Sequence, residues 1–176
     1  MEGVDLKKTS GVDTKFEASH NLALAQRDSG AIEPALTFFL KGTPLETVVE
    51  DGPPDESRGG AFYGNIGRSL HLMGQINQAL ICYRKSAQII EEEVHSDSLA
   101  NKGYIRDWVG ELMYLKGHKE LASAGFSAAV HCWELIAPPK AESIERRFYA
   151  SEFEGLAPLP RDAAEKRFLS WIQEGK

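Results

Sequence analysis

The sequence predicts an all-α fold in which three similar helical hairpins stack as a right-handed superhelix and a C-terminal pair of helices caps the stack. Three glycines recur 44 and 43 residues apart, at Gly30, Gly74 and Gly117. The stretches around them, starting at Asn21, Asn65 and Trp108, align without a gap. Their apolar residues recur at steps of three and four, which places them on one face of a helix. Each stretch is therefore expected to form a helix, a tight turn and a second helix.

The order of small and large residues is the same in all three stretches. In the first helix a large aliphatic residue precedes a very small one, as in Leu22 and Ala23, Ile66 and Gly67, and Val109 and Gly110. In the second helix an alanine is followed four residues later by an aromatic residue, the pairs being Ala35 and Phe39, Ala79 and Tyr83, and Ala122 and Phe126. Helices approach closely only over small residues, and the glycine between them ends the first helix in the left-handed conformation. One such hairpin cannot bury its apolar face alone, so we expect the three to stack.

This pattern resembles the tetratricopeptide repeat (TPR) family over about residues 14 to 137. The best match is the middle unit, Ala61 to Glu91, where the signature positions hold Tyr63, Ile66, Gly67, Leu70, Gly74, Ala79, Leu80 and Tyr83. The family's commonest repeat is about 34 residues, so the longer period here is similar to the kinesin-light-chain and bacterial regulator branches. None of the units has the proline that commonly closes a repeat. The resemblance implies a superhelix whose first helices line a concave surface.

The predicted helices of the repeats span residues 14–29, 32–42, 57–73, 76–94, 98–116 and 119–136. They form three units, 14–50, 57–96 and 98–137. A polar tail, residues 1–13, precedes them and is expected to be disordered, and Thr14 with Glu17 resembles a capping box that opens the first helix.

The connection between the first two units is rich in glycine and proline. Pro44, Pro53 and Pro54 favour a broken or extended segment. A second interpretation is that Leu45, Val48 and Val49 continue the preceding helix after a kink at Pro44. Both interpretations are open at this point.

Two further helical patterns follow Pro138 and Pro139, over residues 141–156 and 161–175. Their apolar stripes consist of Ile144, Phe148 and Phe153, and of Ala164, Phe168, Trp171 and Ile172. An uncovered end of a repeat stack exposes its core, so residues 138–176 are predicted to be a capping pair of helices.

Composition restricts the classes of partner. The chain has 176 residues, with 20 Lys and Arg against 26 Asp and Glu, for a formal net charge of -6. Because phosphate contacts need a clustered basic face, this balance and the scattered basic residues disfavour a nucleic-acid partner. No apolar run approaches the roughly 18 residues that indicate a membrane span, and no secretory leader is recognisable. We therefore expect no membrane partner and a cytoplasmic location.

The sequence contains no recognisable catalytic motif. A phosphate-binding glycine loop, a nucleophile elbow, a zinc-protease motif and a cysteine cluster are all missing, so we expect no enzyme, no catalytic residue, no cofactor and no metal. Cys82 and Cys132 are interpreted as small packing residues on second helices. Glu91 and His95 are four residues apart on a helix, which is compatible with a metal site, but a solvated helix end is the favoured interpretation.

The TPR register predicts a partner-binding groove on the first helices. The residues assigned to it are His20, Leu24, Arg27, Asn65, Arg68, His71, Tyr104, Asp107, Glu111 and Tyr114. Of the positions with which some TPR proteins hold a terminal carboxylate, only Asn65 keeps its residue type, so that mode of binding is not expected. We expect a protein-protein interaction scaffold that binds a peptide or helix with apolar anchors and charge of either sign. The alternative for each residue is a solvated face or an internal ion pair.

Two other functions fit the same repeats. The chain is compatible with a sensor or regulatory fragment of a larger signalling protein, and with a homodimer that serves as a structural module. The three tryptophans distinguish a monomer from a dimer: Trp108, Trp133 and Trp171 are expected to be exposed together at an interface, or buried if the protein is monomeric.

Overall fold

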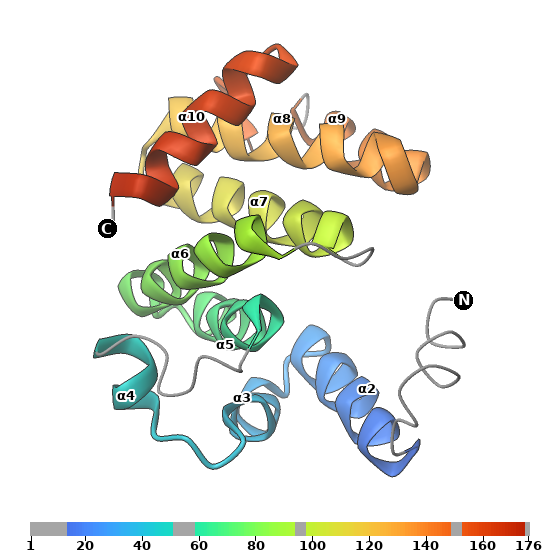
Figure 1. The fold of residues 1–176 in the computed structure, drawn as a ribbon, viewed down its shortest axis with the longest axis vertical. Coiled ribbons are helices and arrows are strands. Elements are labelled where there is room, and N and C mark those ends of the chain that lie inside the picture. Colours follow the sequence, from blue (N-terminus) through green and yellow to red (C-terminus); the bar gives the residue numbers. More distant parts are fainter. Residues whose placement is uncertain (1–13, 51–58, 94–97, 149–152, 175–176) are drawn as a thin grey trace.

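The computed structural model describes residues 14–50, 59–93, 98–148 and 153–174, and within these ranges the protein is helical with no strand. The helices are α2 (Thr14–Asp28), α3 (Ile32–Leu40), α4 (Leu45–Glu50), α5 (Gly60–Leu72), α6 (Ile76–Glu92), α7 (Ser98–Leu115), α8 (Lys119–Ile136), α9 (Pro138–Phe148) and α10 (Arg161–Glu174). Figure 1 shows them following one another along the long axis, from α2 to α4 at one end to α8, α9 and α10 at the other. The prediction of an all-α fold is confirmed for this part of the chain.

Six of these helices correspond to the six predicted for the repeats. Helix α8 has the predicted bounds, and the largest difference is at α5, which begins at Gly60. The carboxylate of Glu93, after the end of α6, accepts a hydrogen bond of 3.2 Å from the Gly60 N–H. This bond satisfies one of the donors that a helix N-terminus leaves unpaired. The predicted tail at residues 1–13 and the side chains of the capping box lie outside the described residues.

The three inter-helix glycines end their helices in the same way. Gly30, Gly74 and Gly117 have φ values of 101°, 80° and 81°. At the second turn the Gly74 N–H donates to the His71 carbonyl (3.0 Å) and the Gln75 N–H donates to the Leu70 carbonyl (2.9 Å). The first and third turns have the same two bonds, which define the Schellman motif. The prediction of left-handed glycines at these turns is confirmed.

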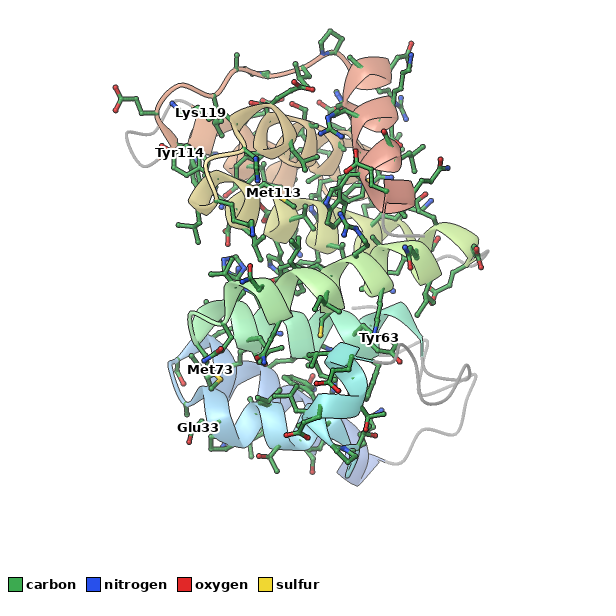
Figure 2. The ribbon with its side chains drawn as sticks, turned by 90° about the vertical axis from the view of Figure 1, so that its left-hand side faces the viewer. Glu33, Tyr63, Met73, Met113, Tyr114 and Lys119 are labelled. Carbon is green, nitrogen blue, oxygen red and sulfur yellow. The ribbon has the colours of Figure 1, made fainter. Side chains whose placement is uncertain are left out.

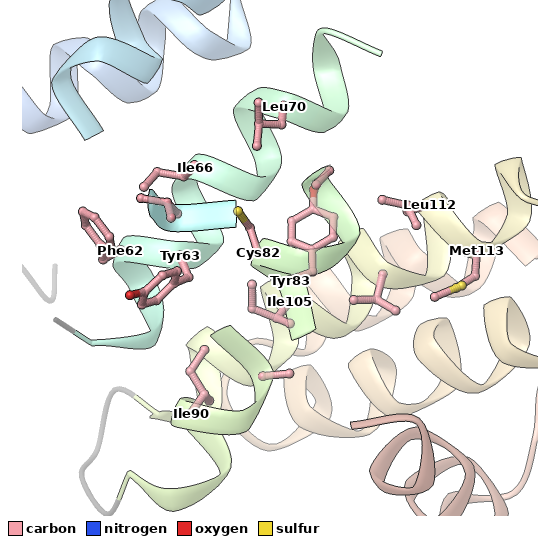
Figure 3. Close-up of a cluster of buried hydrophobic side chains, with 14 of the residues drawn as sticks. Phe62, Tyr63, Ile66, Leu70, Cys82, Tyr83, Ile90, Ile105, Leu112 and Met113 are labelled. Atoms are coloured by element: carbon pink, nitrogen blue, oxygen red, sulfur yellow. The ribbon is translucent and has the colours of Figure 1, made fainter. Parts of the chain in front are cut away.

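Small residues lie where the two helices of a unit cross. A Cβ added to Gly67 would be 2.7 Å from the Tyr83 ring, and one added to Gly110 would be 2.8 Å from the Phe126 ring. The missing side chain of each glycine therefore leaves room for the aromatic ring of the following helix, as the sequence pattern predicts. Figure 3 shows Tyr83 within the resulting apolar cluster, together with Leu112 from the next unit. The core is thus continuous between the second and third units.

The segment after α3 is broken. Lys41 and Gly42 both have positive φ values, 51° and 80°, and α4 is a separate short helix that starts after Pro44. The interpretation of a helix continuing through a kink is wrong, because two successive left-handed residues reverse the chain. Val48 of α4 is fully buried, and its carbonyl accepts a 2.8 Å hydrogen bond from the Lys85 ammonium on α6.

The C-terminal helices pack on the second helices of the units. Helix α9 packs against α8, and α10 packs against both α8 and α6. Helix α9 begins at Pro138, where the missing N–H of proline costs nothing, and ends at Phe148, before the predicted limit of 156. The predicted apolar residues are buried where the structure describes them: Ile144, Phe153, Ala164, Phe168, Trp171 and Ile172. The Phe148 side chain lies outside the described residues.

Candidate functional site: a cleft between the first helices

Polar contacts connect the first helices of successive units. Arg27 on α2 donates to the side-chain oxygen of Asn65 on α5 at 3.1 Å. Arg68 on α5 donates to the Glu111 carboxylate on α7 at 2.6 Å. The guanidinium of Arg147 on α9 then contacts the other oxygen of Glu111. Side-chain contacts therefore link α2 to α5, α5 to α7, and α7 to α9.

The first of these contacts is out of register with the others. Arg68 and Glu111 occupy equivalent positions, 43 residues apart, as expected for helices in neighbouring repeats. Asn65, however, is equivalent to Asn21, and its partner on α2 is Arg27, six residues further on. The last turn of α2 thus meets the second turn of α5.

A cleft of about 330 Å³ lies between α2, α5 and α7. Five of the ten predicted groove residues line it, namely His20, Leu24, Arg27, Asn65 and Tyr104. Ala61 and Gly64, on the first turns of α5, form its narrow wall without large side chains. We call this feature the cleft.

The floor of the cleft is aromatic, and two arginines contact its tryptophan. The guanidinium carbons of Arg27 and Arg68 each lie 5.4 Å from the centre of the Trp108 ring. Tyr104 lies 5.6 Å from Trp108 between ring centres and is 40% exposed. From the sequence, Trp108 was predicted to report on a dimer interface and was not among the ten groove residues. Its contact with two arginines gives the cleft an apolar surface held in one orientation by cation-π interactions.

His20 lies on the opposite wall, on α2. Its ring lies 6.0 Å from the Phe39 ring in an edge-on arrangement and 6.2 Å from the Phe38 ring in a tilted one. Burial lowers the pKa of His20, and the positive charges of Lys41 and Arg27 lower it further. At neutral pH we therefore treat His20 as an uncharged hydrogen-bonding group at the cleft.

The other five predicted residues do not line the cleft. Arg68 and Glu111 bind each other, and Asp107 binds Arg147 at 2.6 Å. His71 lies 2.9 Å from the Tyr83 hydroxyl, and burial with the nearby Arg68 lowers its pKa to about 4. The Tyr114 hydroxyl donates to the Glu154 carbonyl at 3.3 Å. These five residues interact with other groups of the protein, so they follow the alternative of internal contacts and not the predicted groove.

Helix α9 explains why this half of the predicted groove is covered. Arg147 contacts Asp107 and Glu111, and its guanidinium carbon lies 5.0 Å from the Phe126 ring. Lys140 lies over the rings of Tyr104 and Trp133, at 4.5 and 4.4 Å. Neither basic residue was identified from the sequence. Helix α9 lies outside the three repeats, so the spacing of the repeats gave no signal for Lys140 or Arg147.

Two carboxylates share the Arg147 guanidinium, and burial affects them differently. Burial raises the pKa of Asp107 to about 6, and the adjacent negative charge of Glu111 adds to this, although Arg147 opposes it. Burial would also raise the pKa of Glu111, but its hydrogen bond and charge interaction with Arg68, together with Arg147, hold it below the usual value. As the pH falls, Asp107 is therefore the first of the pair to be protonated.

The exchange of Asp107 for asparagine should change the pH dependence of stability. Because the pKa of Asp107 is higher in the folded state, its contribution to stability is present below about pH 4 and is lost as the pH rises through about 6. Asparagine does not titrate. The free energy of unfolding of the wild type minus that of Asp107→Asn should fall by about 3 kcal/mol between these limits. Urea unfolding at several pH values measures it, and a difference that is constant with pH contradicts the prediction.

Glu91, Cys82 and Cys132, which were singled out from the sequence, do not line the cleft. No three histidine, cysteine, aspartate or glutamate side chains are grouped there as a metal ion would require. Glu91 is not a solvated helix end, because it binds Arg106 at 2.8 Å, and His95 lies outside the described residues. Cys82 and Cys132 are buried, as predicted for packing residues. Among the helices described, none has both the length and the apolar character to cross a membrane.

Comparisons of the chain with protein-family models, with curated proteins and with solved structures find no match. The resemblance to the TPR family therefore stays a prediction. It is based on the residues and helix packing of this chain alone.

Proposed function

We propose that the protein is a non-catalytic scaffold with a TPR-like superhelix, and that it binds a short segment of a partner protein in the cleft. The observation that carries the proposal is the cleft itself, about 330 Å³ between the first helices of three units. In stacked helical hairpins these helices line the concave surface that recognises other proteins. The cleft is also large enough to receive side chains of a bound segment.

The chemistry of the cleft indicates the kind of segment. Trp108, Leu24 and the half-exposed Tyr104 provide an apolar contact surface for an aliphatic or aromatic anchor. Asn65 and Asn101 offer amide groups to a peptide backbone. The Arg27 guanidinium at the cleft is paired at 3.0 Å with Asp28, which also lines the cleft, so a residue of either charge can lie next to the anchor.

The placement of the tryptophans favours a monomer as the binding species. Trp133 and Trp171 are 4% and 2% exposed, and Trp108 is half-buried beneath the two arginines. They do not form the exposed aromatic group that we expected for a homodimer.

Selection from a displayed random-peptide library, followed by fluorescence anisotropy with the selected peptide, tests the proposal. Ala61 is exposed on the cleft wall, so Ala61→Arg should fill the cleft without removing a core contact. We expect at least a tenfold loss of affinity, about 1.4 kcal/mol, for Ala61→Arg and for Tyr104→Ala.

Ile81→Arg is the matched control. Ile81 is 40% exposed on α6, a second helix, and does not line the cleft. This variant should bind the selected peptide with the affinity of the wild type. Peptides that bind Ala61→Arg and the wild type equally well, or a selection that yields no specific binder, would exclude the cleft as the binding site.

A further inference from the structure

A second cavity, of about 350 Å³, lies away from the cleft, where α10 passes back over α6. Its walls come from α6, from the turn between α7 and α8, and from α10. Figure 2 labels Met113, which lines it, and Lys119, the first residue of α8. We call this cavity the α10 pocket. The proposed scaffold function does not use it.

Three cationic side chains line the α10 pocket: Arg84, Lys116 and Arg167. Two carboxylates oppose them, and both bind the same cation, since Arg167 lies 3.1 Å from Glu120 and 3.5 Å from Glu174. These glutamates are 76% and 54% exposed, so their ion pairs with Arg167 are weak and exchange readily with solvent. Lys116 donates to a neutral amide, that of Asn77, at 3.1 Å. The pocket therefore has a net positive charge.

Arg84 is the least satisfied of the three cations. Its guanidinium carbon lies 4.7 Å from the centre of the Trp171 ring, and its buried Nε has no hydrogen-bond acceptor. No carboxylate among the described residues lies within ion-pair distance of it. A buried donor without an acceptor costs free energy, because water no longer solvates it and no protein group replaces the water. The stacking on Trp171 also fixes the plane of the guanidinium before any ligand arrives.

Backbone donors lie on the same side of the pocket. The first intrahelical bond of α8 runs from the Ala122 N–H to the carbonyl of His118, and the His118 side chain does not cap the helix. The N–H groups of the first turn, up to Leu121, are therefore left without intrahelical acceptors. Both His118 and Leu121 line the pocket. The His118 N–H is itself bonded to the Met113 carbonyl, so the backbone donors left at this end of the pocket are those of Lys119, Glu120 and Leu121.

We propose that the α10 pocket binds the phosphoryl group of a small phosphate ester. Arg84 and Lys116 are the lining cations that form no ion pair among the described residues, and a phosphate dianion supplies three acceptor oxygens for them and for the first turn of α8. Leu80, Met113 and Trp171 form an apolar wall beside these donors, which accommodates the organic part of the ester. Recognition of this kind is independent of peptide binding in the cleft.

Isothermal titration at constant ionic strength, with inorganic phosphate and with phenyl phosphate as probes, tests the proposal. We expect saturable binding of both, with the ester tighter because it also contacts the apolar wall. Arg84→Gln should weaken binding at least tenfold, and Lys116→Gln, which changes an exposed side chain, should weaken it severalfold. Arg146→Gln is the matched control, since Arg146 is 77% exposed on α9 and outside the pocket. Circular dichroism melts check that each variant is folded.

The outcomes separate the alternatives. A wild type that shows no saturation with either probe, with a dissociation constant weaker than about 10 mM, overturns the proposal. Equal weakening by Arg146→Gln and Arg84→Gln also overturns it, because the effect is then general charge. Acetate that binds as tightly as phosphate excludes phosphoryl recognition. Ala61→Arg, which fills the cleft, should leave phosphate binding unchanged, so the two proposals fail separately.

Discussion

Replacing Gly125 with alanine is expected to destabilise the protein by about 2–3 kcal/mol, because the added methyl group overpacks a contact between two helix backbones. A Cβ at this position would lie 2.8 Å from the Arg106 carbonyl oxygen and 3.0 Å from the Cα and N of Gly110. These are backbone atoms of α7, which cannot rotate away as a side chain can. Helices α7 and α8 must separate to accept the methyl group. Urea unfolding followed by circular dichroism measures the loss.

Gly64→Ala is the matched control, since it places the same methyl group in the interior of another helix. Its Cβ would meet the Cδ1 end of Ile105 at 2.8 Å and the Ser86 hydroxyl at 3.1 Å. Both are side-chain atoms, and Ile105 can adjust its rotamer. Alanine also favours a helix over glycine by about 0.5–1 kcal/mol at either site, which offsets part of the cost. We expect Gly64→Ala to change stability by less than about 1 kcal/mol. If the two variants lost the same free energy of unfolding, the contact of Gly125 with the α7 backbone would not be the cause of the loss.

The repeat pattern predicts helices well because it reports on packing that all three units share. The glycine turns, and the small residues facing Tyr83 and Phe126, follow directly from the aligned sequence. Gly125 shows where such an alignment stops being informative. The equivalent residue of the second unit is Cys82, so a feature of one unit only disappears when the three are compared. The close approach of α7 and α8 is specific to the third unit.

The groove residues were harder to predict than the helices. The TPR register assumes that the first helices lie side by side in equal steps, whereas Arg27 of α2 meets Asn65 of α5 six residues out of register. A signal for the internal ion pair was present in the sequence, because Arg68 and Glu111 have opposite charges at equivalent positions. Arg147 gave no such signal, since α9 lies outside the repeats.

The second large effect is expected at Arg106, whose replacement by methionine should destabilise the fold by about 3 kcal/mol. Arg106 on α7 is 3% exposed and binds two carboxylates from different helices. Glu91 on α6 lies 2.8 Å away, and Glu165 on α10 contacts the guanidinium with both oxygens. The guanidinium carbon of Arg106 also lies 5.2 Å from the centre of the Phe168 ring. Methionine fills similar space but leaves two half-buried carboxylates without their shared counter-ion, and α10 loses its charged contact with α7.

Arg167→Met is the control that shows whether the loss of stability depends on burial or only on the number of ion pairs removed. Arg167 also contacts two glutamates, but these are largely exposed, so its loss should cost less than about 1 kcal/mol. If the cost at Arg106 comes from the unpaired carboxylates, then adding Glu165→Gln to Arg106→Met should recover a substantial part of it. The same loss of stability for Arg106→Met and Arg167→Met, or no recovery in the double variant, would show that packing rather than charge determines the effect. A recovery would instead identify the Arg106 cluster as the electrostatic contact that fixes α10 against α6 and α7, and with it the wall of the α10 pocket.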